Sequence, residues 1–250
     1  MKRKSNRIAI VSDIHGNSLA FKEVLFDIKS KGIKTIINLG DSLYGPMDPK
    51  GTYELLIENE VISILGNQDR FILENLDLKS DFITMEYVKT QINDDLVEWL
   101  KKLPFSLVFD EEIYCCHASP QSDSSYLLEC LKPDHIALKD SHEIENLLIE
   151  IKQRIIVCGH SHIPRIVKTD NKTVINPGSV GLQAYDDELP IPHKMENFST
   201  HARYSIMNYD YNSPIIIHIA VCYDYEKAAK KAEENKRTDW AKWIRSGRVK

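Results

Sequence analysis

Several features that mark other protein classes are missing from this sequence of 250 residues. Its longest uninterrupted apolar runs are four or five residues, such as 8–11, whereas a transmembrane helix needs about 20. The apolar stretch after the basic start ends at Ser12, which is short of the roughly 7–15 residues of a secretory signal. The sequence also has no internal repeat and no Gly/Ser-rich linker. We therefore expect one cytoplasmic domain over residues 1–250 that makes no use of a membrane.

Cysteine is scarce, and its spacing shows no disulfide or metal-binding motif. There are five cysteines, an odd number, and no C-x-x-C motif. Three of them lie in apolar runs that are typical of strands. We expect small buried thiols in a reducing compartment rather than a disulfide framework.

Charge is distributed unevenly along the chain. The net formal charge is −5, yet residues 1–7 carry four basic groups and no acid, and residues 226–250 carry nine basic and four acidic groups. Residues 8–225 are therefore left with a net charge of −14. A nucleic-acid binder usually presents a basic face, so this acidic body argues against a nucleic-acid partner and against a nuclease. An acidic body that handles an anionic substrate needs cations to reverse the local field.

Apolar periodicity predicts an alternation of strands and helices, which indicates the α/β class with mixed sheets and covering helices. The expected strands are 8–12, 35–38, 61–65, 105–109, 113–116, 154–158, 163–169, 173–176, 204–208 and 214–222. The expected helices are 17–30, 53–59, 93–103, about 140–152, and two terminal helices between about 225 and 246. Residues 182–201 interrupt this rhythm with two prolines and four acids. We expect an irregular loop there, either a plain surface excursion or a lid or subunit contact near the functional site.

A potential metal ligand follows an apolar strand at five places in the chain. These ligands are Asp13 and His15, Asp41, Asn67, His117, and His160 with His162. Ligands of α/β sheets bind beyond the carboxyl ends of the strands. The five strand ends are therefore predicted to gather two Asp, one Asn and four His at one crevice.

The spacing of these ligands fits metal binding. Asp13 and His15 are two positions apart, as are His160 and His162, and such positions of an extended segment face the same way. Carboxylate, imidazole and amide oxygen ligands suit Mn, Fe or Zn. Seven ligands exceed one coordination sphere and are about right for two divalent ions that share a carboxylate. Each short motif alone is usually a turn, but the whole set in this order is highly specific.

The motifs Asp13-Ile14-His15, Gly40-Asp41, Gly66-Asn67-Gln68-Asp69, His117 and Gly159-His160-Ser161-His162 resemble those of the calcineurin-like metallophosphoesterases. The segments 12–17, 41–46, 117–120 and 176–181 are similar in particular to the small bacterial and archaeal phosphodiesterase-like branch. The resemblance covers about residues 7–245. It implies a four-layer α/β/β/α sandwich of two mixed sheets with a di-metal site at the strand ends.

The resemblance also implies a role for each ligand. Asp13, His15 and His162 would hold one ion, and Asn67, His117 and His160 would hold the other. Asp41 would bridge the two ions, and Asp69 would orient its neighbour. Two cations placed in this way lower the pKa of a bridging water, and the resulting hydroxide attacks phosphorus in line.

The chain departs from the family pattern at Gln68, where a His that serves as general acid or oxyanion donor often stands. A glutamine amide donates a hydrogen bond but supplies no proton. The candidate catalytic residues are therefore Asn67, Gln68 and Asp69. We expect a phosphoesterase that cleaves phosphodiester or phosphoanhydride bonds of small, nucleotide-type substrates, because activated leaving groups need less protonation.

Some alternatives stay open. A catalytically weak metal-binding scaffold or regulatory protein with the same fold is the second interpretation, although such scaffolds typically lack several of the ligands. A homo-oligomer is also compatible with the sequence. Tyr44 is a candidate for stacking on a substrate base, Arg70 for reaching a phosphate, and His193 for replacing the missing acid. Trp240 and Trp243 are most simply core-facing residues of the last helix.

Overall fold

Two five-stranded sheets form the centre of the molecule. The computed structural model describes residues 7–209 and 214–249, so the basic segment at residues 1–6 lies outside it. In the first sheet, β1 (Arg7–Val11) runs parallel to β2 (Thr35–Asn38), which runs parallel to β3 (Ile62–Ser63). On the other side, β1 pairs antiparallel with β13 (Ala202–Asn208), and β13 pairs antiparallel with β14 (Ile215–Val221). The strand order is β14-β13-β1-β2-β3.

The second sheet is also mixed and has the order β4-β5-β8-β10-β9. The hairpin of β4 (Ser106–Phe109) and β5 (Ile113–Cys116) joins β8 (Ile155–Val157) through a parallel pairing. β10 (Thr173–Asn176) lies parallel to β8 and antiparallel to β9 (Arg165–Lys168). The expected strands 105–109 and 113–116 therefore form this hairpin, and each sheet has parallel strands at its centre.

The inner faces of the two sheets pack on each other. Ile10 and Ile37 of the first sheet and Cys115, Val157 and Ile175 of the second are fully buried in one apolar cluster. Burying such side chains contributes about 1.5–3 kcal/mol each. The two sheets therefore form the two middle layers, and their parallel strands end on the same side of the molecule.

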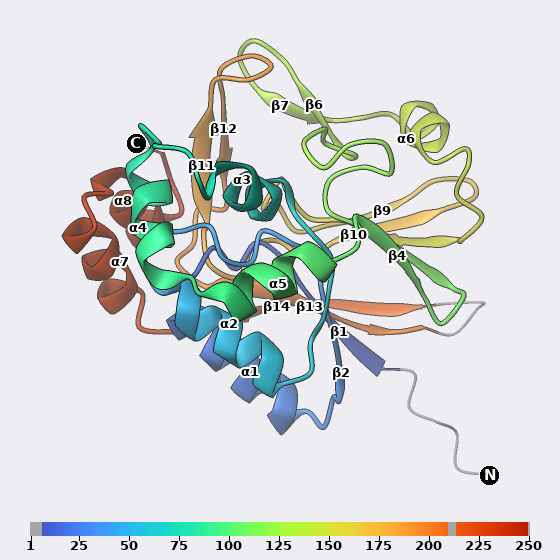
Figure 1. Ribbon diagram of the computed structural model, residues 1–250. Helices are drawn as coiled ribbons and strands as arrows, with labels where there is room; N and C mark the ends of the chain where they lie inside the picture. Colours follow the sequence, from blue (N-terminus) through green and yellow to red (C-terminus); the bar gives the residue numbers. More distant parts are fainter. Residues whose placement is uncertain (1–6, 210–213, 250) are drawn as a thin grey trace.

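Helices cover both outer faces, unequally (Figure 1). The outer face of the first sheet carries most of them, in a cluster that includes Phe21, Tyr204 and Trp240. These helices are α1 (Ser18–Ser30), α2 (Pro49–Glu58), α3 (Asn67–Asn75), α4 (Ile83–Gln91), α5 (Asp94–Lys102), α7 (Tyr225–Glu234) and α8 (Thr238–Ser246). The second sheet is covered by the short α6 (Ser141–Leu147), which buries Ile144. The predicted α/β/β/α order of layers is confirmed.

Local capping explains several of the helix starts. The Asn17 side chain accepts a hydrogen bond from the Ala20 amide at the start of α1, and Asn93 does the same at α5. Asp140 and Glu143 form a capping box at the start of α6. Such caps satisfy amides that have no partner within the helix, and each contributes about 1 kcal/mol.

The structure corrects four expectations about the elements. Residues 182–201 are not irregular, because β11 (Ala184–Asp187) and β12 (His193–Glu196) form an antiparallel hairpin there. Their short, acidic sequences hide the alternation that marks a strand. A second hairpin, β6 (Glu129–Leu131) and β7 (Ile136–Leu138), and helices α3 and α4 were also missed. The helix expected over 140–152 ends at Leu147, and the strand expected over 61–65 is shorter.

Two further findings bear on the cysteines and the helices. All five cysteines are free thiols, and Cys115, Cys116 and Cys158 are buried. No helix within residues 7–209 and 214–249 combines the length and the apolar character needed to cross a membrane.

A glycine contact between two loops gives a prediction about stability. A Cβ at Gly181 would lie 1.8 Å from the Ile14 carbonyl oxygen, whereas a Cβ at Gly32, which has φ +67°, meets no atom within 4 Å. We expect Gly181→Ala to cost about 3 kcal/mol or more of unfolding free energy, because the loop that carries His15 has to move. Gly32→Ala should cost only about 1–2 kcal/mol from its left-handed backbone. Urea unfolding of both variants measures the difference, and equal losses would contradict the loop contact.

Candidate metal centre

The predicted ligands come from five strand-end loops that meet at one side of the two sheets. Asp13 and His15 follow β1, Asp41 follows β2, and Asn67 opens α3 directly after β3. From the second sheet, His117 follows β5, and His160 with His162 follows β8. The parallel arrangement of the strands within each sheet brings these loops together.

Six of the seven predicted ligands form two groups. Asp13, His15 and His162 make up one group. Asp41, His117 and His160 make up the other. Within each group the carboxylate oxygens and ring nitrogens all lie within 4.8 Å of one another. The seventh predicted ligand, Asn67, places Oδ1 3.0 Å from Nε2 of His117, beside the second group.

Backbone carbonyls orient the imidazole rings. In His15, His117 and His162 the Nδ1 atom lies at hydrogen-bonding distance from a carbonyl oxygen, which only accepts, so Nδ1 carries the proton. Their Nε2 atoms therefore point into the centre. His160 has the opposite orientation, with Nε2 3.2 Å from the Ser124 carbonyl and Nδ1 left free for the centre. The carbonyl acceptors of the other three rings belong to Tyr44, Leu39 and Leu182, at 3.0, 2.8 and 2.7 Å.

This arrangement brings electron pairs together without an intervening proton. The Nε2 atoms of His15 and His162 are 3.0 Å apart although each ring already carries its proton on Nδ1. Oδ1 of Asp13 is buried and has no hydrogen-bond partner. It lies 3.4 Å from Nε2 of His162. Lone pairs and a carboxylate that face each other in a buried site are the donor set of a divalent cation, so these residues fit a metal ion.

The backbone is strained at the same positions. Five of the six grouped residues have a positive φ, between 51° and 67°, which side chains other than glycine rarely adopt. Each such conformation costs of order 1–3 kcal/mol and persists only where the surroundings enforce it. Functional sites are the usual place for this strain. The five residues are Asp13, His15, Asp41, His160 and His162.

Burial and mutual charge shift the pKa values of the imidazoles in different directions. Burial and the nearby His162 together lower the pKa of His15 to about 4. Burial and His117 lower the pKa of His160 to about 4. For His117 burial also opposes the charged form, but the Asp41 carboxylate outweighs it and raises the pKa to about 10. The ion-free centre therefore holds a proton on His117, at the place where a cation would sit.

Asp69 fastens the two loops of the second group together. Its carboxylate accepts hydrogen bonds from the backbone amides of Ser42, Leu43 and Gly66 at 3.0–3.3 Å. Burial and the charge of Asp41 raise the pKa of Asp69 to about 7, against the effect of these amides. The adjacent Gln68 donates its backbone N–H to Oδ1 of Asp41 at 2.8 Å. Asp69 thus orients Asp41 and Asn67 without facing the centre itself.

The centre opens into a cavity of about 300 Å³. Its floor includes five of the predicted ligands and Gln68. Its walls contain groups that the sequence did not single out for this role, on the β11–β12 hairpin, α8 and the start of α4. These are Phe82, Leu182, Tyr185, Asp186, Asp187, Arg237, Trp240 and Trp243, with Tyr44 beside them. Only the tertiary structure brings these distant segments to the ligands.

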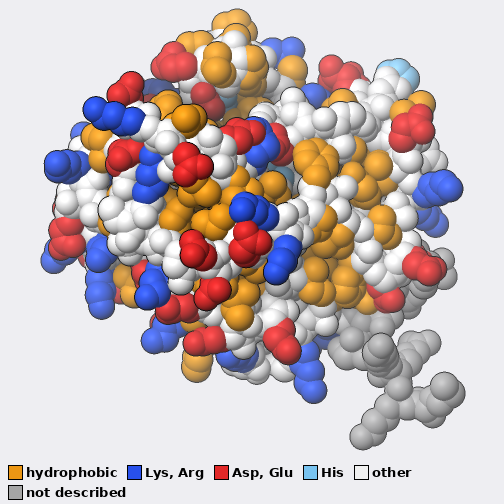
Figure 2. All heavy atoms as spheres, in the orientation of Figure 1, with side chains coloured by type: hydrophobic (Ala, Val, Ile, Leu, Met, Phe, Trp, Pro, Cys, Tyr) orange, Lys and Arg blue, Asp and Glu red, His pale blue; other side chains and the backbone are white. Residues whose placement is uncertain are grey.

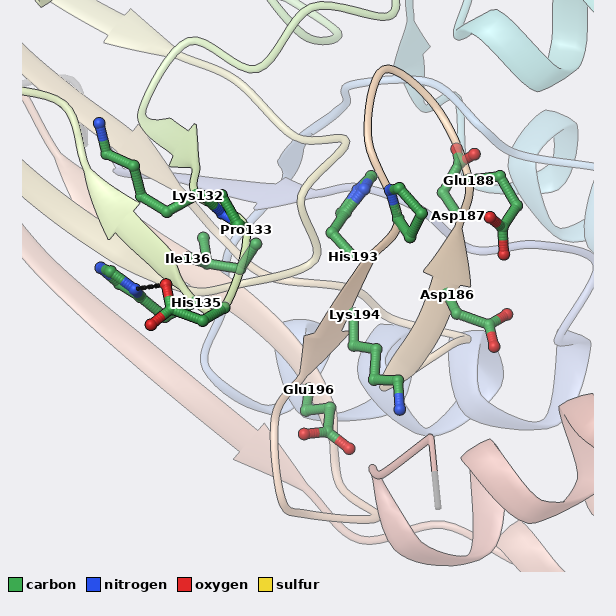
Figure 3. Close-up of a pocket in the computed structure, with 12 residues that line it drawn as sticks. Lys132, Pro133, His135, Ile136, Asp186, Asp187, Glu188, His193, Lys194 and Glu196 are labelled. Atoms are coloured by element: carbon green, nitrogen blue, oxygen red, sulfur yellow. Dashed lines mark hydrogen bonds and ion pairs between the residues drawn. The ribbon is translucent and has the colours of Figure 1, made fainter.

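A second cavity, of about 510 Å³, lies behind the β11–β12 hairpin (Figure 3). It is lined by residues of both small hairpins, among them Lys132, His135 and His193. Asp186 and Asp187 line both cavities, so the β11 strand separates them.

The remaining candidates from the sequence have different outcomes. Tyr44 lines the metal-centre cavity, as its proposed role in stacking requires. Arg70 is held in ion pairs with Asp123 and Glu74 and does not line this cavity. His193 lines only the second cavity, and its Nε2 lies 2.7 Å from the Tyr126 hydroxyl. Trp240 and Trp243 are buried in the core, as expected, and their remaining surface faces the metal-centre cavity.

Comparisons with known proteins agree with the fold. The model of the calcineurin-like phosphoesterase superfamily domain matches residues 7–191. An uncharacterized protein of Methanocaldococcus jannaschii, MJ0912, is 29% identical over 93% of this chain and 94% of its own length. A metallophosphoesterase structure from Sphaerobacter thermophilus has a TM-score of 0.78 at 20% identity and covers 97% of this chain and 99% of its own. The hypothetical protein PH1004 of Pyrococcus horikoshii OT3 has a TM-score of 0.72 at 20% identity, with 97% and 98% covered.

The two layered sheets and the paired Asp/His groups define a metallophosphoesterase fold with residues compatible with a binuclear metal site. The family model covers most of the chain. The chain therefore belongs to the calcineurin-like phosphoesterase superfamily.

Removing one carboxylate tests the metal centre. We expect Asp41→Asn to lower the affinity for divalent metal by more than about 100-fold, because the amide brings no negative charge to the grouped lone pairs. The measurement is the metal content of the dialysed protein by elemental analysis. Asp140→Asn is the matched control, since Asn is an equally good N-cap for α6. An Asp41→Asn protein that retains two ions per chain would show that the centre lies elsewhere.

The proton on His117 gives a prediction about pH. A metal ligand has to be deprotonated, so binding to the group that contains His117 displaces one proton at any pH below about 10. We expect metal affinity for this group to rise about tenfold per pH unit between about pH 6 and 8. His15, with a pKa near 4, adds nothing to this slope. Titration calorimetry in two buffers of different protonation enthalpy counts the proton released, and no release at pH 7 would refute the assignment.

Proposed function

We propose that this protein is a metal-dependent phosphoesterase that hydrolyses phosphodiester or phosphoanhydride bonds of a small, nucleotide-type substrate. Asp13, His15 and His162 would hold one divalent ion. Asn67, His117 and His160 would hold the other, and Asp41 would bridge both. The single observation that carries this proposal is the inward-facing set of carboxylate oxygens and ring nitrogens in two adjacent groups.

When bound, two such ions supply a strong positive field that activates water and neutralises the charge of the phosphoryl group. Mn, Fe and Zn all suit carboxylate and imidazole ligands. The protein's part is to keep the ligands fixed. The Nδ1–H bonds to backbone carbonyls prevent the rings from rotating, and such partners typically affect metal affinity by 10–100-fold.

The loop after β3 fixes the side of the centre that faces the substrate. Gln68 holds Asp41 through its backbone and lines the cavity with its side chain. Its Oε1 is buried and has no hydrogen-bond partner. The amide N–H₂ can donate to a phosphoryl oxygen but transfers no proton. Asp69 positions this loop, and Asn67 directs its Oδ1 toward the second group.

The cavity offers no obvious replacement for a histidine acid. Among the described residues, the histidines that line it are His15, His160 and His162, all of them proposed ligands. His193 lies in the neighbouring cavity. Substrates with leaving groups that need little protonation, such as aryl esters and phosphoanhydrides, are therefore favoured.

Hydrolysis of a substrate panel with added Mn²⁺ tests the proposal. The panel contains aryl diesters, phosphate monoesters, cyclic nucleotides and dinucleoside polyphosphates, each compared between the natural protein and Asp41→Asn. Turnover that requires Asp41 supports the proposal. A protein that binds two ions and hydrolyses none of the panel supports a regulatory or scaffolding role for the same fold instead.

The role of Gln68 gives a sharper prediction. We expect kcat/KM of the natural protein to fall steeply as the leaving-group pKa rises, because a well-placed general acid contributes about 10²–10⁴ in rate and is missing here. Gln68→His should flatten this dependence by raising the rates of poor leaving groups. The measurement is kcat/KM for a series of substituted phenyl esters with both proteins.

The matched control is Gln68→Asn, which keeps an amide and should keep the steep slope. A flat dependence in the natural protein would mean that another group already protonates the leaving oxygen. His193 would then be the first residue to replace.

A further inference from the structure

One side of the metal-centre cavity is built from aromatic side chains. Phe82, Tyr44, Trp240 and Trp243 all line it, and they come from three parts of the chain. This side begins next to the proposed ligands. The ring of Trp240 meets the ring of the proposed ligand His15 edge-on, with centroids 5.6 Å apart. Trp243 continues this surface, with its centroid 6.3 Å from that of Trp240. The aromatic surface thus begins at a proposed metal ligand and extends outward.

Phe82 is the outer end of this surface, and its position is not explained by folding. Its side chain is 60% exposed although it is a large apolar group. It occupies the N-cap of α4, where it makes no side-chain cap, and aromatic residues are not among the favoured caps. Phe71 lies between Phe82 and Tyr44 and meets both rings edge-to-face. Its ring centroid is 5.5 Å from that of Phe82 and 5.7 Å from that of Tyr44. The ring is held in place at the cavity while much of it remains open.

A fixed cation completes the aromatic surface. The guanidinium of Arg237 lies over the Trp240 ring, 5.2 Å from its centroid. Asp239 accepts hydrogen bonds from Arg237 Nε at 2.9 and 3.1 Å, and Thr84 of α4 accepts another. Because Asp239 neutralises Arg237, this group offers a planar donor surface more than a free positive charge.

The polar groups of the cavity argue against a purely apolar occupant. Tyr185, Asp186 and Asp187 face the aromatic side from the β11–β12 hairpin. Their carboxylates disfavour a polyanion such as a nucleic-acid strand. A volume of about 300 Å³ is at the lower end for small-molecule sites, so it suits one compact group. In Figure 2 acidic and basic side chains are mixed on the visible face. This face has no continuous basic surface of the kind that binds a nucleic-acid strand.

We propose that this aromatic surface is a subsite for a nucleobase carried by the phosphorylated substrate, which stacks on the exposed ring of Phe82 and contacts the small part of Trp243 that faces the cavity, while its polar edge meets Arg237 and the β11 carboxylates. The inference rests on the proposed function, because the phosphate has to lie at the metal centre. Every base has a π face, so stacking tolerates different bases. The site should therefore distinguish nucleosides from aliphatic groups more than one base from another.

Two diesters with the same leaving group test the subsite. Thymidine 5′-(p-nitrophenyl phosphate) carries a base, and methyl p-nitrophenyl phosphate does not. Their ratio of kcat/KM should fall about 5-fold or more in Phe82→Ala and in Trp243→Leu, since stacking on one aromatic is worth about 1–3 kcal/mol. Phe26→Ala is the matched control, because Phe26 is 71% exposed on α1 and does not line the cavity. Its ratio should stay at the natural value.

Binding gives a readout that does not depend on turnover. We expect calorimetry of the Zn²⁺-loaded protein to show thymidine 5′-monophosphate binding at least about 5-fold more tightly than 2-deoxyribose 5-phosphate. Phe82→Ala should reduce this preference, and Phe26→Ala should leave it intact. Thermal unfolding of each variant shows whether it is folded. If Trp243→Leu does not fold, the result for Phe82→Ala alone decides between the outcomes.

The two proposals fail in different ways. If the natural protein hydrolyses neither diester nor any member of the substrate panel but prefers the nucleotide in calorimetry, the phosphoesterase proposal is wrong and the subsite stands. If both diesters are hydrolysed with a ratio that Phe82→Ala and Trp243→Leu leave unchanged, the subsite is wrong and the phosphoesterase proposal stands. Equal binding of the two monophosphates also overturns the subsite.

Discussion

The repulsion among ligand atoms at the centre is the constraint on which the surrounding structure depends. Two carboxylates and four imidazoles meet there, with one ligand atom of each facing inward. Left alone, they would move apart or take up protons, as the raised pKa of His117 illustrates. They stay in place because five of them sit on backbone held at positive φ and three of the rings are tied to carbonyl oxygens. A divalent cation reverses the sign of these interactions.

The two sheets enforce this geometry by their packing. The apolar layer between them fixes the separation of β1 and β2 from β5 and β8, so the loops from both sheets reach the same point. Within the loops, close approach of backbone to backbone leaves no room for side chains. A Cβ at Gly66 would lie 2.2 Å from the Asp41 amide, and Asp69 joins the same two loops through its carboxylate. The packing of the core therefore stabilises loop conformations that would be unfavourable on their own.

The outer layers do more than cover the sheets. Helices α4 and α8 belong to the large helical face, yet Phe82, Arg237 and Trp243 on or beside them line the cavity over the centre. The β11–β12 hairpin closes the opposite side. Metal ligation thus depends on the strand ends alone, whereas the groups that would contact the rest of a substrate come from the covering elements. Such elements can change without disturbing the ligands, which is how one fold supports different specificities.

The sequence by itself determined the ligands, because each one follows an apolar strand and the spacing between neighbours is short. Asp13 and His15, and His160 and His162, were predictable since local geometry alone places such pairs on one side of an extended segment. The order of layers was expected from the resemblance to the calcineurin-like metallophosphoesterases. The hairpin at residues 182–201 and helices α3 and α4 were not expected, because their short segments lack a clear period. Only the tertiary structure decided which way each ring faces and that the tryptophans of α8 reach the centre. The carbonyls that orient the rings lie 20 to 78 positions away in the sequence, and Trp240 meets His15 from the other end of the chain.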